Sequence, residues 1–232
     1  MSAELLDNAA WHALGTHHAA YAQTVGVARR YAPDVSVFAA ADALTGAAWT
    51  DLAALGGEAR FVCLFRREAP DPPAGWKMLM RARAHQMVAE PGHLTVVAPA
   101  DVRPLDATHV PEMLALVALT KPGPFEARTI ELGRYLGVFT DGRLVAMAGE
   151  RIHLDGHTEV SAVCTHPDAQ GRGLGAAVTH AVAAGIAERG ERAFLHVAAD
   201  NHNARRVYER LGFTTRAMVD VLVARPPEPA SH

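Results

Sequence analysis

A glycine-rich turn between a short apolar strand and a helix constrains this chain most. The segment 163–175 reads VCTHPDAQGRGLG, so an apolar run stops at a proline and glycines precede the next helix. Such a turn leaves several backbone N–H groups unpaired at the positive end of a helix dipole. The sequence therefore predicts a site for a phosphate-sized anion, built from backbone.

Composition narrows the classes of protein that can carry this turn. The chain has 232 residues, half of them apolar, with 22 Lys+Arg against 25 Asp+Glu. Such a balance gives no reason to expect nucleic acid or a membrane as partner. Cys63 and Cys164 form no disulfide framework, which favours a reducing cytoplasm. We also expect neither a signal peptide nor a membrane span, because no basic start or long apolar run is present.

Prolines near residues 91 and 99 divide the chain into an N-terminal α/β domain, residues 1–98, and a second domain, residues 99–232. In the first domain, apolar spacing predicts helices over 8–26 and about 49–55, and strands over 35–39, 60–65 and 78–88. In the second domain, the same reasoning predicts helices over 111–119, 174–189 and 203–211, and strands over 101–104, 136–140, 143–152, 159–165, 193–198 and 215–224.

Two Asp-Gly pairs, at 141–142 and 155–156, predict hairpins that link three of these strands. Hairpins combined with helices between strands imply a mixed sheet. The fold class is therefore α/β or α+β rather than a purely parallel sheet.

Three known glycine turns can be compared with this one. A Walker A loop needs Gly-Lys-Ser/Thr at its end, which is absent here. A dinucleotide fingerprint is formally matched by Gly171, Gly173 and Ala176, but Glu191 precedes its strand instead of ending it. The third, the acyl-CoA pyrophosphate loop Gln/Arg-x-x-Gly-x-Gly/Ala, fits residues 170–175.

This loop is flanked by segments 163–167 and 203–213, in the same order as in the GCN5-related N-acetyltransferase (GNAT) family. The chain resembles this family, and within it the FR47-like branch. The resemblance covers roughly residues 100–224. It implies a GNAT fold there, acetyl-CoA as cosubstrate and no metal. The first domain has no copy of the loop and resembles a degenerate GNAT-like unit that would wall the acceptor site.

The resemblance also implies how coenzyme A is held. Backbone N–H groups of the loop would bind the pyrophosphate, and the strand before it would pair with the pantetheine arm. Arg172 either adds charge to a phosphate or is solvated, and Asn203 either caps its helix or contacts the pantetheine arm. The expected CoA-binding residues are Val163, Cys164, Thr165, Gln170, Gly171, Arg172, Gly173, Leu174, Gly175, Asn203 and Arg206.

Catalytic roles follow from the same resemblance. Tyr208 would be the general acid that protonates the departing thiolate, and its alternative role is core packing. Glu159 would be the base for the amine, directly or through water. The alternatives are a solvated strand end, or Glu150 as base on the adjacent strand.

The expected reaction is transfer of an acetyl group to a small-molecule or peptide amine by direct attack in a ternary complex. A non-catalytic acyl-CoA-binding sensor or interaction module is the alternative. Phe125, Glu126 and Arg128 are the expected acceptor contacts, in the family's substrate-facing loop. The protein is expected to be a monomer or homodimer. Of the histidines, His17 has no acidic partner nearby in sequence, and His196 is either buried core or a substrate contact.

Overall fold

The computed structural model describes residues 3–56, 61–90, 92–97 and 100–228. Its helices are α1 (Ala9–Gly15), α2 (Gly46–Gly56), α3 (Val110–Thr120), α4 (Leu174–Glu188) and α5 (His202–Arg210), with short 3-10 helices at Ala3–Asn8, Ala19–Tyr21, Ala107–His109, Thr129–Leu132 and Pro167–Ala169. Its strands are β1 (Ala22–Val25), β2 (Ala28–Tyr31), β3 (Phe38–Ala41), β4 (Val62–Arg66), β5 (Lys77–Ala89), β6 (Val102–Leu105), β7 (Tyr135–Thr140), β8 (Arg143–Leu154), β9 (His157–Thr165), β10 (Arg192–Ala198) and β11 (Thr214–Arg225).

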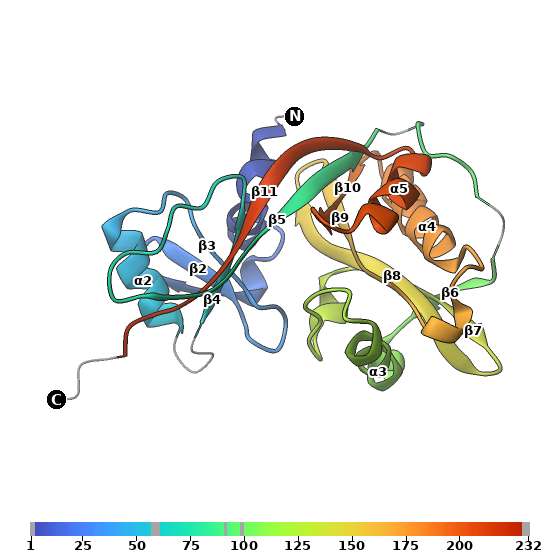
Figure 1. The fold of residues 1–232 in the computed structure, drawn as a ribbon, viewed down its shortest axis with the longest axis horizontal. Helices are drawn as coiled ribbons and strands as arrows, with labels where there is room; N and C mark the ends of the chain where they lie inside the picture. Colours follow the sequence, from blue (N-terminus) through green and yellow to red (C-terminus); the bar gives the residue numbers. More distant parts are fainter. Residues whose placement is uncertain (1–2, 57–60, 91, 98–99, 229–232) are drawn as a thin grey trace.

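The eleven strands found among the described residues form one sheet in the order β1-β2-β3-β4-β11-β5-β10-β9-β8-β7-β6 (Figure 1). The strands β7, β8 and β9 are joined by antiparallel hairpins, while β9 and β10 are parallel. The predicted mixed sheet is confirmed. None of the helices within the described residues has both the length and the apolar character needed to cross a membrane.

The helix predicted over 8–26 is wrong beyond Gly15. The chain instead turns into β1, which pairs with β2 in a hairpin. Gly26 adopts a left-handed φ of 49°, and the N–H of Val27 donates to the Asp51 carboxylate at 2.9 Å. These two features stabilise a turn that the helical apolar spacing does not reveal. The other predicted elements are present with shifted ends, and Arg60, at the start of one, lies outside the described residues.

The C-terminal strand β11 lies between β4 and β5 (Figure 1). It joins the part of the sheet formed by β1 to β4 to the part formed by β5 to β10. On its other edge, β5 pairs antiparallel with β10. A strand from the first hundred residues therefore lies between two strands of the second half, β11 and β10. The predicted boundary at 98/99 falls on residues outside those described, and the division into two domains stays a prediction.

The sheet splits between β9 and β10. Their parallel pairing covers three residue pairs and ends at Phe194 opposite Glu159. Beyond that point β10 continues along β5, whereas β9 continues along β8. A register shift lies between Met147 and Gly149 of β8, and Ala162 opposite it has a left-handed φ of 52°. The bulge turns β9 away from β10 and leaves an opening between them.

Helices fill the space on both faces of this split sheet. On α4, Val178, Val182 and Ile186 recur at intervals of four residues and are almost fully buried against one face. On α3, Met113 and Leu116 pack against the opposite face. The opening between β9 and β10 is thus fixed by well-packed cores on each side.

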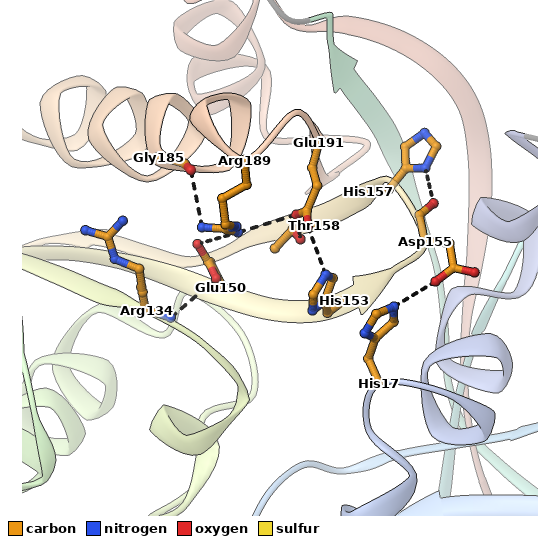
Figure 2. Close-up of polar contacts among 10 residues, drawn as sticks. All are labelled: His17, Arg134, Glu150, His153, Asp155, His157, Thr158, Gly185, Arg189 and Glu191. Carbon is orange, nitrogen blue, oxygen red and sulfur yellow. Dashed lines mark hydrogen bonds and ion pairs between the residues drawn. The ribbon is translucent and has the colours of Figure 1, made fainter. Parts of the chain in front are cut away.

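A polar cluster fastens the N-terminal segment to the β8–β9 hairpin (Figure 2). The His17 Nε2 atom lies 2.8 Å from the Asp155 carboxylate, and the His17 ring stacks on His153 at 4.0 Å. His153 in turn contacts Glu191 at 3.1 Å. The acidic partner of His17 is therefore not near it in sequence but 138 residues away.

Candidate active site

The glycine loop has the geometry of a backbone anion site. Gly171 and Gly173 both have a φ of 75°, and a Cβ built on either would meet no atom within 4 Å. Gly173 is the N-cap of α4, and no side chain caps that helix. The first N–H groups of α4 therefore face open space at the positive end of its dipole, where a phosphate would fit.

Two cavities follow the split in the sheet from this loop. The first, the loop cavity, has a volume of about 440 Å³ and runs beside Gln170, Gly171 and Gly173. The second, the cleft cavity, has about 360 Å³ and lies between β9 and β10. Together they are lined by eight of the predicted CoA-binding residues: Val163, Cys164, Thr165, Gln170, Gly171, Gly173, Leu174 and Gly175.

The other three predicted CoA-binding residues, Arg172, Asn203 and Arg206, are exposed and do not line these cavities. The Oδ1 atom of Asn203 accepts a hydrogen bond from Arg206 at 2.8 Å. The cap of α5 is Asn201, which accepts from the Ala204 N–H at 3.1 Å. Asn203 as N-cap is therefore wrong, since the N-cap residue lies two positions earlier in the chain.

Asn201 also lines the cleft cavity, which makes it a candidate missed by the sequence analysis. Two asparagines at 201 and 203 were each able to cap, and only the backbone geometry distinguishes them.

Tyr208 lies where the cavities meet. Its side chain is 8% exposed and lines the loop cavity, the cleft cavity and a third, larger cavity described below. Burial raises the pKa of its phenol to about 12, and nearby Cys164 adds to the effect. The phenol is therefore protonated at neutral pH and can donate. Its ring also contacts Phe213 edge-on at 6.3 Å, so it is anchored in the core at the same time.

Glu159 belongs to a fully buried ion pair. The Arg151 guanidinium donates to both carboxylate oxygens, at 2.8 and 2.6 Å, and His196 Nδ1 lies 2.7 Å from one of them. Burial raises the pKa of Glu159, but Arg151 and His196 outweigh it and hold the value at about 2. Such a carboxylate is a poor proton acceptor for an amine. This environment argues against the predicted role of Glu159 as base.

His196 is held in one tautomer by its neighbours. The Arg216 guanidinium donates to Gln86 Oε1 at 2.6 Å, which turns the Gln86 amide nitrogen toward His196 Nε2 at 3.0 Å. Since an amide nitrogen only donates, Nε2 must accept, and the ring proton is placed on Nδ1 facing Glu159. Burial lowers the pKa of His196, so the imidazole is neutral.

Glu150, the alternative base, lies on β8 away from the cavities, within the polar cluster shown in Figure 2. It pairs with Arg189 at 3.0 Å and accepts from the backbone N–H of Arg134 at 3.4 Å. It does not line any of the three cavities. Its position gives it no access to an acceptor amine there.

The third cavity, here called the apolar cavity, has a volume of about 500 Å³. It lies between the split and the sheet face formed by β3, β4, β11 and β5. From the loop 121–129, the residues that line it are Pro122, Gly123 and Pro124. The three predicted acceptor contacts lie elsewhere: Phe125 is buried against Tyr135, Glu126 is partly buried, and Arg128 pairs with Asp34 and Glu131.

A mixed sheet split beside a glycine loop defines the acyl-CoA N-acyltransferase class of folds, and comparison with known proteins agrees. The family model described as FR47-like protein matches residues 135–221. A GNAT-family protein from Novosphingobium aromaticivorans, described as an acetyltransferase, is 38% identical; the similarity covers 95% of this chain and 98% of that one, with a TM-score of 0.87. The chain belongs to the GCN5-related N-acetyltransferase family.

Similarity over a shorter part of the chain is found to named enzymes. Mycothiol acetyltransferase from Mycobacterium avium is 43% identical over 96 residues, which cover 37% of this chain and 30% of that protein. The corresponding protein from Thermomonospora curvata is 42% identical over 88 residues, 38% of this chain and 29% of that one. The match thus spans less than a third of these curated relatives.

Proposed function

We propose that the protein is an N-acetyltransferase that transfers the acetyl group of acetyl-CoA to a small-molecule amine by direct attack in a ternary complex. The observation that carries this proposal is the position of Tyr208. Its phenol lines both the cavities at the glycine loop and the apolar cavity on the other side of the split. A donor and an acceptor bound in these spaces would meet beside one protonated phenol.

The residues present fit coenzyme A. The open, left-handed glycines at 171 and 173 and the uncapped start of α4 would hold the pyrophosphate. The free edge of β9 beyond Glu159 would pair with the pantetheine arm, and backbone N–H groups at its bulge would polarise the thioester carbonyl. Arg172, Asn203 and Arg206, exposed near this cleft, remain proposed contacts for the outer parts of the cosubstrate.

The first hundred residues have a proposed role in this arrangement. The apolar cavity is walled by Phe38, Cys63 and Phe65 from β3 and β4, in addition to β5. This supports a function in shaping the acceptor site for a segment that carries no phosphate loop of its own.

Tyr208→Phe is the variant that tests the proposal. It removes the phenolic proton and keeps the ring that packs on Phe213. We expect the turnover rate, measured as release of the CoA thiol from acetyl-CoA, to fall by roughly 10²-fold or more. The affinity for CoA, measured by calorimetry, should be unchanged. Binding of acetyl-CoA without turnover in the unsubstituted protein, over a broad amine panel, would instead identify a non-catalytic acyl-CoA sensor.

A further inference from the structure

The wall of the apolar cavity follows from the register of four strands. Phe38 of β3 stands opposite Cys63 of β4, Cys63 opposite Val223 of β11, and Val223 opposite Met80 of β5. Side chains at paired positions project from the same face of a sheet. All four line the cavity, so one row of the sheet presents carbon and sulfur atoms to it.

A second row repeats the pattern. Phe65 of β4 stands opposite Val221 of β11, and Val221 opposite Ala82 of β5. These three residues also line the cavity. The Cys63 thiol does not make the wall reactive, because burial raises its pKa to about 12. The two rows form a continuous apolar surface on the side of the cavity facing Tyr208.

The charged side chains that line the apolar cavity are Arg151 and Glu159, which pair with each other, and the exposed Arg83, whose Nε lies 3.8 Å from the Asp220 carboxylate. Glu159 is the carboxylate among its described lining residues, and both of its oxygens accept from Arg151. His196 beside it is neutral for the reasons given above. An ammonium ion entering this cavity would find no uncompensated anion among those residues and would give up water on the side that packs against the apolar wall. The cavity thus favours a neutral amine over its protonated form.

We infer that the acceptor is a small primary amine with an apolar, aromatic or branched aliphatic body, bound as the free base. This inference rests on the proposed function and names its substrate class. The apolar body would lie against the two rows, with the amine directed toward Tyr208. Polyhydroxylated amines and lysine side chains of peptides are poor acceptors, because the two apolar rows offer their polar groups no hydrogen-bond partners.

The chemical step balances with these groups alone. The amine nitrogen forms a bond to the thioester carbonyl carbon, and the C–S bond breaks with its electron pair on sulfur. Tyr208 gives its proton to the sulfur. The proton released from the nitrogen, as the amide forms, returns to the Tyr208 oxygen. An amine that arrives neutral needs no additional base, which agrees with the ion-paired state of Glu159.

A paired acceptor panel tests the inference. Thiol release from acetyl-CoA is measured with phenethylamine and aniline as apolar amines, and with glucosamine and a lysine-containing peptide as polar ones. We expect kcat/KM to be at least tenfold higher for phenethylamine than for either polar amine. Below the pKa of phenethylamine its kcat/KM should rise about tenfold per pH unit. The value for aniline, which is already neutral, should not change in this way.

Matched variants locate the effect in the cavity. Val221→Thr and Val223→Thr each add a hydroxyl to the apolar wall, while Val62→Thr makes the same change on the opposite face of the same sheet, where Val62 packs against α2. Circular dichroism and thermal melting establish that each variant is folded. We expect the two wall variants to raise KM for phenethylamine roughly tenfold and the control to leave it unchanged.

The possible outcomes separate the inference from the proposed function. Equal or faster acetylation of glucosamine or the peptide would overturn the inference and leave N-acetyltransferase activity standing. So would wall variants that behave like Val62→Thr. If acetyl-CoA binds but none of the amines is acetylated, both the inference and the proposed function fail.

Discussion

Replacing Glu159 by glutamine isolates the electrostatic part of the site with almost no change in shape. The substitution removes the anion that accepts two hydrogen bonds from Arg151 and one from His196. The side chains of Arg151 and Glu159 are only 9% and 0% exposed, so solvent cannot replace the lost charge. Arg151 would be left as a buried, unpaired cation.

Two estimates of the cost agree. Breaking a buried ion pair by removing one partner costs about 3–5 kcal/mol. Independently, the depression of the Glu159 pKa from 4.5 to about 2 corresponds, at about 1.4 kcal/mol per unit, to roughly 3 kcal/mol of stability. We expect Glu159→Gln to lower the free energy of unfolding at neutral pH by about 3 kcal/mol, out of a typical total of about 5–15.

Urea denaturation followed by tryptophan fluorescence measures this change. Because the Glu159 pKa is lowered on folding, its stabilising effect is complete above its unfolded pKa and is lost as the pH falls toward the folded value. The difference between the unsubstituted protein and Glu159→Gln should therefore stay constant from neutral pH down to about pH 4.5 and shrink as the pH falls from there toward about 2. The double variant with Arg151→Met should recover part of the stability, since it removes the unpaired cation. A loss below about 1 kcal/mol, or a difference that does not shrink in acid, would refute the buried ion pair as described.

Three further predictions concern the cofactor cleft and its helix. Tyr208→Phe should reduce kcat by roughly 10²-fold or more at unchanged CoA affinity; equal losses of binding and turnover would show that the tyrosine only supports the core. Gly173→Ala should weaken CoA binding at least tenfold by calorimetry, because its φ of 75° strains any other residue and a methyl group would stand where the phosphate binds. Undiminished affinity would exclude the loop as the pyrophosphate site. Asn201→Ala should cost about 1 kcal/mol in thermal unfolding, as loss of a helix cap does, and Asn203→Ala should cost clearly less; the reverse order would contradict the observed cap.

Local signals in the sequence were sufficient for most of the fold. The two Asp-Gly pairs predict their hairpins through adjacent residues, and both hairpins are present, as are the helix expected over 174–189 and the strand expected over 78–88. The helix expected over 8–26 is wrong beyond Gly15 because a β1–β2 hairpin follows there, and the turn of this hairpin is held by Asp51, which is distant in sequence. The order of the strands in the sheet could not be predicted from local sequence either, because β11 pairs with strands more than a hundred residues away.

The candidate site divides in the same way. The glycine loop could be predicted because backbone geometry there is encoded by adjacent residues. The state of Glu159 could not, because it is set by Arg151 on the neighbouring strand and by His196 beyond the split. The two apolar rows of the apolar cavity could not be predicted either, because they form only through the register of β3, β4, β11 and β5.

The central position of β11 has a consequence for how the molecule is made. Val62–Arg66 and Lys77–Ala89 are synthesised long before the strand that joins them. During translation the first therefore has one unpaired edge, and the second has two, because its other neighbour β10 is also synthesised later. Closing the sheet couples segments separated by most of the polypeptide, which is characteristic of slow, all-or-none folding. A ribosome-associated chaperone that covers unpaired strand edges would therefore increase the folding yield of this protein more than its modest size suggests.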